Sequence, residues 1–553
     1  MRKVLALAAI ASLLTGCAQI PRSSSVGLGP EINAGDDSQY IYYSPSLPTK
    51  GDNQIQIVSG FLSAGNGPQN DYSTARAYLS TARQATWKPS KEVLIEAAPP
   101  KITKLSETVL DVDVQIQATI DEKGVYSTQS EGTTRHLQYH LLKQSGQWRI
   151  HNAPDLTVVA QPNFQVLFRS YSVYYYDRNH SYLVPDVRWF PSRSATATHL
   201  AAAVLAGPQS WLAPAVAEDS YGSFGLNTDA VTINDGVASI DLDSRAMKVP
   251  KRTLQYVKAE LRNTLLQLPQ VTAVSISISK NIQNVADIQT QIGSTTSGQL
   301  IALNALGLSV SNSSKILYSR SELETLVGGQ VTDFALNNSG NLALVTSHGA
   351  YRTQPAVIGG SPKLVDSRTR LLSPQFDNRG VLWTVSAAKN SSWLVSDPGG
   401  TVYGVKRPPN LRAVSVSSFA ISPDGSRLAV ATRGTSAALY VMPIIRNETG
   451  IPMALGVGVK ILVSSASVKS VSWSDSIHLA TLELVEAGVA RPSIRMVGGQ
   501  VQSFALLYNA KTVVSLGGSS AFFVLSADGS VLQLKNSLWN QVQSGATALH
   551  YSN

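Results

Sequence analysis

The sequence predicts a multidomain protein of mixed class, with two small α+β domains followed by an all-β region that forms a β-propeller of about six blades. The chain has 553 residues, which at about 100–200 residues per domain corresponds to about three or four domains. Helical spacing of apolar residues is confined to the part before about residue 290. Beyond it, short apolar strands and glycine-centred turns recur at intervals of about 40 residues.

Composition excludes several other classes of protein. Hydrophobic residues make up 43% of the chain and charged residues only 15%, which is too apolar for a disordered chain. No apolar run after residue 17 reaches the ~20 residues that span a bilayer, so a protein with several membrane helices is excluded. The single cysteine excludes a disulfide framework and any zinc or iron–sulfur site built on cysteines.

The N-terminal residues have the pattern of an export signal for a lipoprotein. Two basic residues precede an apolar stretch over residues 4–14, which at ~1.5 Å per residue is too short to cross a bilayer. The motif Leu14-Thr15-Gly16-Cys17 then resembles the bacterial lipobox, whose cysteine takes a diacylglyceryl group. We therefore predict a signal peptide over residues 1–16 and a lipid on Cys17 that anchors the mature chain to the outer face of the cell membrane. The alternative is an ordinary secretory signal with an incidental cysteine.

A tether and a first domain follow the lipobox. Residues 17–50 are rich in Pro, Gly and Ser and show no hydrophobic period, which predicts a flexible tether. The first α+β domain, over residues 51–162, begins with apolar residues at helical spacing in residues 55–82. The period then changes to two in residues 110–118, as in a strand with one buried face. Helices followed by a twisted antiparallel sheet make an α+β domain.

The second α+β domain is predicted over residues 163–288. Two strands come first, over residues 166–176 and 183–190, and a helix from about Ala195 ends at Gly207-Pro208. A hairpin then turns at Asn234-Asp235-Gly236. A helix over residues 254–268 and a strand over residues 271–278 complete the domain.

The propeller is predicted over residues 289–553 from turns that recur along the chain. Five segments align on a turn glycine: Gly298, Gly340, Gly380, Gly425 and Gly529. The interval before Gly529 is long enough for one further unit, and the segment around Trp473 lies near its middle without a glycine. Six units account for most of this region. The competing arrangement is a pair of β-sandwiches.

Several short segments form a set whose order along the chain is specific. They are Leu14-Thr15-Gly16-Cys17, Ile57-Val58-Ser59-Gly60-Phe61-Leu62, Asp71-Tyr72 through Ala75-Arg76-Ala77-Tyr78-Leu79, Leu183-Val184-Pro185-Asp186, Arg188-Trp189-Phe190-Pro191, Leu205-Ala206-Gly207-Pro208 and Ser422-Pro423-Asp424-Gly425. Together they resemble the LpqB family of actinobacterial envelope lipoproteins. The resemblance implies a nuclear transport factor 2-like domain, a GerMN domain and a propeller. It also implies an accessory protein that meets the extracytoplasmic region of a two-component sensor histidine kinase, with no catalytic residues to carry over.

Two pairs of carboxylates are the candidates for chemistry. Asp111 and Asp113 share one strand face, as do Asp241 and Asp243, at about 6.6 Å for alternate strand positions. A glycoside hydrolase places its two carboxyls about 5–9.5 Å apart, so this distance does not exclude one. The alternatives are a solvated sheet face and, for Asp241 and Asp243, a weak calcium or peptide contact. His136 and His140 stand ~13 Å apart on a strand, too far to share one ion.

A run of aromatic residues is the candidate interaction surface. Strand alternation sends Tyr174 and Tyr176 to the same face, and Trp189 follows in the next strand. Tyrosine and tryptophan are enriched at interface hot spots, so these residues, together with Asp241 and Asp243, are predicted to contact a partner. Packing in the core of a small domain is the alternative.

These features favour a non-enzymatic interaction protein that needs no cofactor and no metal. It would bind one state of a sensor histidine kinase better and shift the kinase's equilibrium. Nucleic acid is not expected as a partner because no run of Lys and Arg occurs, although the formal charge is +9. A cell-wall polymer is a further candidate partner. The alternative function is a cell-wall glycan- or peptide-binding protein or hydrolase.

Overall fold

The computed structural model describes most of the chain after the tether. The described residues are 45–192, 195–219, 221–228, 230–293, 298–311, 313, 315–354, 361–434, 437–461, 467–517 and 521–552. The predicted signal peptide, Cys17 and most of the predicted tether lie outside them. Ser44–Asn553 form one unit. Among the described residues, no helix is long and apolar enough to cross a membrane.

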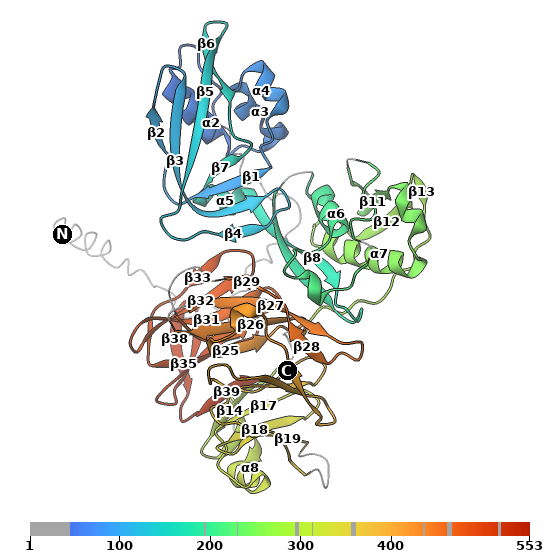
Figure 1. Ribbon diagram of the computed structural model, residues 1–553, viewed down its shortest axis with the longest axis vertical. Helices are drawn as coiled ribbons and strands as arrows, with labels where there is room; N and C mark the ends of the chain where they lie inside the picture. Colours follow the sequence, from blue (N-terminus) through green and yellow to red (C-terminus); the bar gives the residue numbers. More distant parts are fainter. Residues whose placement is uncertain are drawn as a thin grey trace, which may run out of the picture. The chain divides into compact units, whose positions relative to one another are not determined.

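The first domain packs helices against a largely antiparallel sheet, as its sequence pattern predicts, with one parallel strand pair that the pattern did not predict (Figure 1). The helices are α2 (Gln54–Ala64), α3 (Gln69–Ala77) and α4 (Thr81–Thr86). The strands are β1 (Glu92–Glu96), β2 (Lys101–Lys104), β3 (Val109–Asp121), β4 (Tyr126–Thr128), β5 (Thr134–Gln144), β6 (Gln147–Asn152) and β7 (Thr157–Ala160). Their order is β6-β5-β3-β1-β7, with β2 and β4 paired to β3. The predicted period of two is confirmed in β3, where Leu110, Val112 and Val114 are buried.

Local sequence explains where the first helix begins and what it covers. Asn53 and Gln56 form a reciprocal capping box at the start of α2, which satisfies backbone N–H groups that have no partner within the helix. Val58 and Phe61 of α2 then reach the core of the sheet, where Phe61 packs against Trp87 with ring centroids 5.1 Å apart. Aromatic pairs of this kind add to the free energy gained from burial alone.

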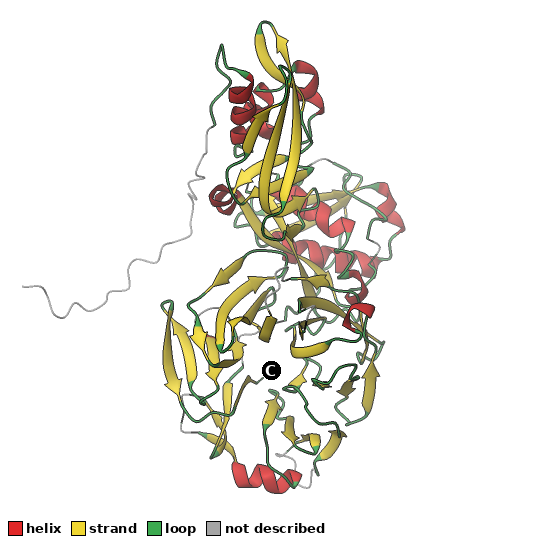
Figure 2. Cartoon of the chain, turned by 60° about the vertical axis from the view of Figure 1, so that its left-hand side comes forward, coloured by secondary structure: helices red, strands yellow, loops and turns green. Residues whose placement is uncertain are grey.

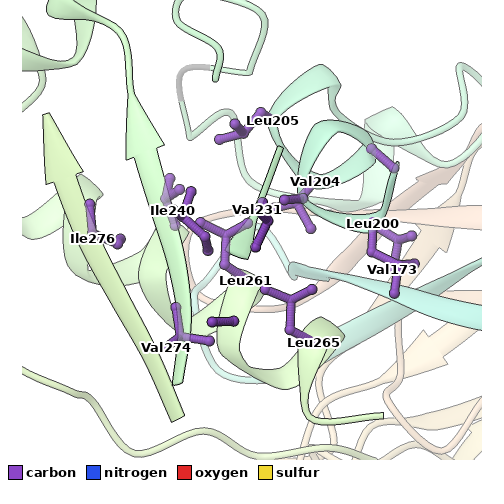
Figure 3. Close-up of a cluster of buried hydrophobic side chains, with 14 of the residues drawn as sticks. Val173, Leu200, Val204, Leu205, Val231, Ile240, Leu261, Leu265, Val274 and Ile276 are labelled. Atoms are coloured by element: carbon purple, nitrogen blue, oxygen red, sulfur yellow. The ribbon is translucent and has the colours of Figure 1, made fainter. Parts of the chain in front are cut away.

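The second domain combines a long hairpin with a small mixed sheet. Its elements are α5 (Gln161–Leu167), β8 (Phe168–Tyr176), β9 (Leu183–Pro191), α6 (Thr196–Ala206), η1 (Ala213–Ala215), β10 (Thr232–Asn234), β11 (Val237–Leu242), η2 (Ser244–Lys248), α7 (Lys251–Leu265), β12 (Ala273–Ile278) and β13 (Asn281–Ile282). The predicted turn is confirmed, with positive φ at Asp235 and Gly236 between β10 and β11. The parallel pair β11–β12 is connected through α7, and Leu200, Ile240 and Leu261 meet in the core (Figure 3).

The C-terminal region is a propeller of six blades, which confirms the fold class predicted from the repeat (Figure 2). The strands of blades one to three are β14 (Leu300–Asn304), β15 (Gly307–Val310) and β16 (Ile316–Ser319); β17 (Asp333–Leu336), β18 (Leu342–Thr346), β19 (Gly349–Thr353) and β20 (Lys363–Asp366); and β21 (Gln375–Phe376), β22 (Leu382–Val385), β23 (Trp393–Ser396) and β24 (Val402–Val405). Helix α8 (Arg320–Val327) connects the first two blades, and η3 (Pro409–Leu411) follows the third.

The strands of the last three blades complete the ring. They are β25 (Ser415–Ile421), β26 (Arg427–Arg433), β27 (Leu439–Arg446), β28 (Pro452–Leu455) and β29 (Val459–Lys460); β30 (Ser467–Trp473), β31 (His478–Glu486), β32 (Val489–Met496), β33 (Val501–Ser503) and β34 (Leu507–Tyr508); and β35 (Ala510–Ser515), β36 (Phe522–Ser526), β37 (Val531–Lys535) and β38 (Leu538–Gln543). The last strand, β39 (Ala548–Tyr551), pairs with β14 and becomes the innermost strand of blade one. The first and last parts of the propeller sequence therefore close the ring together.

The turn glycines mark the blades, with one correction. Gly340, Gly380 and Gly425 lie between the first and second strands of their blades with φ near +70° to +80°, a conformation that favours glycine. Gly529 instead lies between β36 and β37, so its alignment with the others was wrong. The turn between the first and second strands of the fifth blade contains no glycine. There Asp475 Oδ1 accepts hydrogen bonds from two backbone N–H groups, which hold the turn.

Candidate functional site

The carboxylate pair of the second domain is occupied by structural hydrogen bonds. Asp241 accepts hydrogen bonds from Ser277 Oγ and Asn227 Nδ2, both at 2.6 Å. Asp243 caps η2 and pairs with Arg245 at 2.6 Å. Burial raises the pKa of Asp241, but the hydrogen bonds that it accepts lower the pKa by more, so it lies below the ordinary value. The pKa of Asp243 is also lowered, chiefly by the hydrogen bond from Arg245. A general acid needs a raised pKa, so this pair is unsuited to that role.

The carboxylate pair of the first domain is engaged across its sheet. Asp111 accepts a hydrogen bond from Gln138 Nε2 at 3.0 Å, and Asp113 Oδ1 lies 2.6 Å from His136 Nδ1. Each partner stands directly opposite in the β3–β5 ladder, so the two carboxylates are held in separate cross-strand pairs. Within the described part of the chain, no three His, Cys, Asp or Glu side chains gather as ligands for a metal ion.

The aromatic run lies mostly inside the protein. Tyr176 is 1% exposed and Trp189 is 6% exposed, so the prediction that they form part of an exposed interaction surface was wrong. Tyr174 is half-buried on the same hairpin. Trp189 packs against Phe164 with ring centroids 5.0 Å apart, which connects the β8–β9 hairpin to α5. Packing, the alternative drawn from the sequence, therefore describes Tyr176 and Trp189.

Helix α7 explains why the hairpin does not join a larger sheet. Glu260 and Thr264 of α7, together with Gln267 just after the end of the helix, accept hydrogen bonds from backbone N–H groups at alternate residues of β8. The acceptors thereby occupy the free edge of β8 with side chains in place of another strand. Polar residues at helical spacing within the apolar face of α7 were the sequence signal for this contact.

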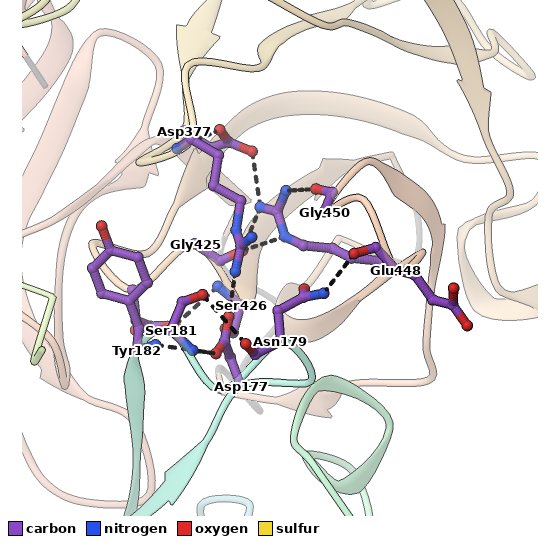
Figure 4. A network of polar contacts seen from close by, with 12 residues as sticks. Asp177, Asn179, Ser181, Tyr182, Asp377, Gly425, Ser426, Glu448 and Gly450 are labelled. Atoms are coloured by element: carbon purple, nitrogen blue, oxygen red, sulfur yellow. Dashed lines mark hydrogen bonds and ion pairs between the residues drawn. The ribbon is translucent and has the colours of Figure 1, made fainter. Parts of the chain in front are cut away.

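The tip of the hairpin docks on the propeller through an ion pair. Asp177, directly after β8, pairs with Arg379 of blade three at 2.5 Å. Its other carboxylate oxygen accepts hydrogen bonds from the backbone N–H groups of Ser181 and Tyr182, which hold the turn of the hairpin (Figure 4). Asn179 Nδ2 donates to the carbonyl oxygen of Glu448 in blade four at 3.1 Å.

A second set of contacts lies along β9. Trp189 Nε1 donates to the carbonyl oxygen of Gly498 in blade five at 2.8 Å. Arg427 of blade four donates to the carbonyl oxygens of Pro185 and Ser476, and its guanidinium lies 4.9 Å from the centroid of the Trp473 ring. We call the contacts of Asp177, Asn179, Pro185 and Trp189 with Arg379, Arg427, Glu448 and Gly498 the hairpin joint. The hairpin joint fixes the second domain to three consecutive blades.

The inner strands of the propeller surround a cavity of about 470 Å³. An inner strand has no neighbouring strand on the side of the cavity, so its backbone N–H and C=O groups need other partners. Side chains of the preceding blade supply them: Ser418 Oγ accepts from Val471 N, and Ser470 Oγ accepts from Val513 N, both at 3.1 Å. The wall of the cavity is therefore rich in hydroxyl groups.

Three cations from consecutive blades line one mouth of this cavity. They are Arg433, Lys469 and Lys511, all exposed. Lys469 Nζ donates to the carbonyl oxygen of Ala510 at 2.7 Å, and Lys511 Nζ to that of Thr547 at 2.9 Å. Partial burial and then the nearby charge of Lys511 lower the pKa of Lys469. We call this end of the cavity, with its three cations, the cation mouth.

The cation mouth and the hairpin joint lie at opposite ends of the inner strands. Lys469 and Lys511 stand near the first residues of β30 and β35, whereas Arg379 lies in the turn that follows inner strand β21 and Arg427 begins the strand after inner strand β25. Charge is also unevenly distributed along the sequence. Residues 289–553 hold 20 Lys and Arg against 12 Asp and Glu, which is nearly all of the formal excess of +9.

Comparison with known protein families agrees with this architecture. The model described as "Lipoprotein LpqB, N-terminal domain" matches residues 47–165, and "Lipoprotein LpqB beta-propeller domain" matches residues 323–549. Between them, "Sporulation and spore germination" (Germane) matches residues 172–279, as expected for a GerMN-type domain. A Lipoprotein LpqB from Thermobifida fusca is 25% identical, covering 90% of this chain and 89% of its own. One from Cutibacterium acnes is 25% identical over 98% of both chains.

The chain belongs to the LpqB family. A further LpqB relative, from Bifidobacterium longum, is 27% identical over 76% of this chain and 74% of its own. Among solved structures, virginiamycin B lyase from Staphylococcus aureus is matched over 38% of this chain and 83% of its own at 11% identity and a TM-score of 0.26. A TM-score this low carries no argument about function.

The sequence patterns of this LpqB family member did not predict the hairpin joint or the cation mouth. Arg379 and Arg427 follow aspartates of turn motifs, which gave no sign of a contact more than two hundred residues away in sequence. The cation mouth did leave a signal. Val468-Lys469-Ser470 and Ala510-Lys511-Thr512 share the order apolar, lysine, hydroxyl at the start of an inner strand.

Proposed function

We propose that this chain is a lipid-anchored accessory protein of the cell envelope, which binds and modulates an extracytoplasmic partner without catalysing a reaction. The proposed partner is the extracytoplasmic region of a two-component sensor histidine kinase. The proposal includes a signal peptide over residues 1–16, a lipid on Cys17 and a tether over residues 17–50.

The observation that carries the proposal is the hairpin joint. Asp177 and Trp189 connect the second domain to separate blades through an ion pair of 2.5 Å and a hydrogen bond of 2.8 Å. A partner that contacts both the second domain and the propeller meets them in one arrangement, and this would favour one conformation of that partner over another. Such differential affinity is what shifts the equilibrium of a bound protein.

The proposed anchor makes weak contacts sufficient. A lipid-bearing Cys17 would confine the chain to the membrane that holds the kinase, which raises the effective concentration of each protein for the other. Two acyl chains on one residue give stable anchoring, whereas a single chain gives only reversible binding.

The candidate carboxylates support a role without catalysis. Asp241 and Asp243 carry lowered pKa values and accept hydrogen bonds that hold the loop around Asn227 and the start of η2. Asp111 and Asp113 are each engaged by a cross-strand partner. The alternative function, a cell-wall hydrolase, would need such groups free and directed at one substrate.

Crosslinking in intact membranes tests the proposal. Wild-type protein and the variants Cys17→Ser and Ser24→Ala would be crosslinked, recovered and analysed for covalently attached neighbours. We expect the sensor kinase among the neighbours of wild type and Ser24→Ala. We expect Cys17→Ser to be released from membranes and to lose this neighbour.

Two results would contradict the proposal in different ways. Release of Cys17→Ser with the same neighbours retained would show that anchoring is not required for binding. Wild-type protein that remains at the membrane but never captures the kinase would exclude the kinase as the partner.

A further inference from the structure

The two lysines of the cation mouth occupy special positions in their strands. The register between β30 and β31 passes from Val468–Glu483 to Ser470–Leu482, so Lys469 is the extra residue of a β-bulge. Lys511 is the extra residue of the equivalent bulge between β35 and β36. A bulge directs a side chain away from the regular alternation of the strand. Both bulges place a lysine at the cavity rather than on a blade face.

Hydroxyl groups stand next to each bulge on the cavity wall. Ser470 follows Lys469, and its oxygen accepts a hydrogen bond from Val513 N, which leaves the hydroxyl proton available as a donor. Ser418 of the preceding blade has the same arrangement, with Val471 N as its donor. Thr512, directly after Lys511, also lines the cavity.

We propose that the cavity of the propeller binds a phosphate-type oxyanion, held at the cation mouth by Arg433, Lys469 and Lys511 and by the hydroxyl groups beneath them. Each ammonium has three N–H donors and uses one on a backbone carbonyl, so two remain for a ligand. A phosphate oxyanion offers more acceptor oxygens and more charge than a carboxylate, and it matches three cations with adjacent hydroxyl donors. This inference does not depend on the proposed kinase partner.

Counter-charges do not neutralise the cation mouth within the described residues. None of the ion pairs among the described residues of the propeller includes Arg433, Lys469 or Lys511. The carboxylate that begins an inner strand, Asp333, is itself paired with His550 at 2.8 Å and accepts a hydrogen bond from Ser373. Residues 435–436, just after β26, and residues 462–466, just before β30, contain no Asp or Glu in their sequence.

Calorimetry with defined anions tests the inference on the full-length Cys17→Ser variant, which cannot carry the predicted lipid. Inorganic phosphate and pyrophosphate are the free probes, and acetate is the monovalent carboxylate control. Vesicles of phosphatidylglycerol, compared with phosphatidylcholine, separate a lipid head group from a free phosphate as the source. We expect phosphate or phosphatidylglycerol to bind, and acetate to bind more weakly.

A charge-matched pair of variants separates a site from general attraction. Lys469→Gln with Lys511→Gln removes two charges from the cation mouth, and Lys315→Gln with Lys535→Gln removes two exposed charges elsewhere on the propeller. We expect the first variant to bind at least about tenfold more weakly and the second to bind as the parent does. The phosphate-dependent rise in melting temperature should disappear in the first variant alone.

Three outcomes would overturn the inference. No binding of phosphate, pyrophosphate or phosphatidylglycerol vesicles to the parent would exclude the site. An equal loss in both variants would show attraction to net charge only. Unchanged binding after Lys469→Gln with Lys511→Gln would place any anion elsewhere.

Discussion

The carboxylate of Asp177 and the guanidinium of Arg379 meet at 2.5 Å, although 202 residues separate them in sequence. Asp177 is only 3% exposed, and its second oxygen already holds the turn of the hairpin through two backbone N–H groups. One buried carboxylate therefore stabilises the hairpin tip and fastens it to blade three. Removing the cation leaves that charge buried without its partner.

Replacing Arg379 should weaken the hairpin joint. We expect Arg379→Ala to lower the free energy of unfolding by about 3 kcal/mol, the cost of leaving a buried charge unpaired, and to increase hydrogen exchange in residues 177–182. Urea unfolding and exchange mass spectrometry measure both effects. Arg412→Ala, at an exposed arginine of the same propeller, is the matched control. Unchanged exchange at the hairpin tip would mean that the ion pair does not hold the joint.

Trp189 offers a test that separates packing from partner binding. Trp189→Phe keeps an aromatic ring against Phe164 but loses the hydrogen bond to Gly498 O. We expect a loss of about 1 kcal/mol in unfolding free energy, the usual net value of one hydrogen bond, with crosslinking to the partner unchanged. A loss of crosslinking in a variant of normal stability would restore Trp189 to the interaction surface.

The aspartates after and within β11 should affect stability and not cell-wall turnover. Asp243→Asn removes the charge that pairs with Arg245, and Asp241→Asn weakens the hydrogen bonds from Ser277 and Asn227. Since both pKa values are lowered in the folded protein, each carboxylate stabilises the fold above the ordinary Asp range and loses this effect as the pH falls through its folded pKa. We therefore expect both variants to melt earlier than wild type at pH 7 and to approach it in acid. Loss of wall turnover with partner binding intact would favour the hydrolase.

Local periodicity was enough to predict the fold class. Alternation in β3 and the turn glycines Gly340, Gly380 and Gly425 report on neighbouring residues only, and a blade is built from neighbouring strands. The ring closure by β39 depends on a pairing between Leu300 and Tyr551, at the two ends of the propeller sequence. No local pattern specifies such a partner. Gly529 was aligned with the wrong turns because the turn between the second and third strands of a blade can also contain glycine.

The site was harder to predict than the fold for a related reason. Strand alternation assumes that one face of a strand meets solvent, but every residue of β9 is buried. Trp189 of β9 packs against Phe164 and donates a hydrogen bond to Gly498 of the propeller, and the carbonyl oxygen of Pro185 in β9 accepts one from Arg427. Burial of this kind arises from contacts between domains, which the spacing of Tyr174 and Tyr176 cannot indicate.

Glu260 predicts a pH dependence of stability. Burial raises its pKa to about 8, despite hydrogen bonds from Tyr176 N and Tyr221 Oη, and its second oxygen is buried with no hydrogen-bond partner among the described residues. The unfolded chain loses this proton near the ordinary value of 4.5, whereas the folded chain keeps it to about pH 8. The contribution of Glu260 is therefore complete below pH 4.5 and falls by roughly 1.4 kcal/mol per pH unit between these values.

Glu260→Gln should remove this dependence, since the amide stays neutral and keeps an acceptor for Tyr176 and Tyr221. We expect the variant to gain stability relative to wild type as the pH rises from 5 to 8, measured by urea unfolding at several pH values. Glu131→Gln, in an exposed turn, is the control and should follow wild type. Parallel profiles for wild type and Glu260→Gln would mean that Glu260 is ionised in the folded protein.

Removing the last strand should open the propeller. Without residues 548–553, blade one loses its innermost strand, β14 gains an unpaired edge, and Asp333 loses His550 as its partner. Leu549 is 1% exposed, and burial of such a side chain contributes about 1.5–3 kcal/mol by itself. We expect the truncated chain to lose at least ~3 kcal/mol of unfolding free energy and to associate through the exposed edge, as shown by thermal unfolding and size-exclusion chromatography. Deletion of Asn553 alone is the control, and an equal melting temperature for both truncations would show that the ring does not depend on β39.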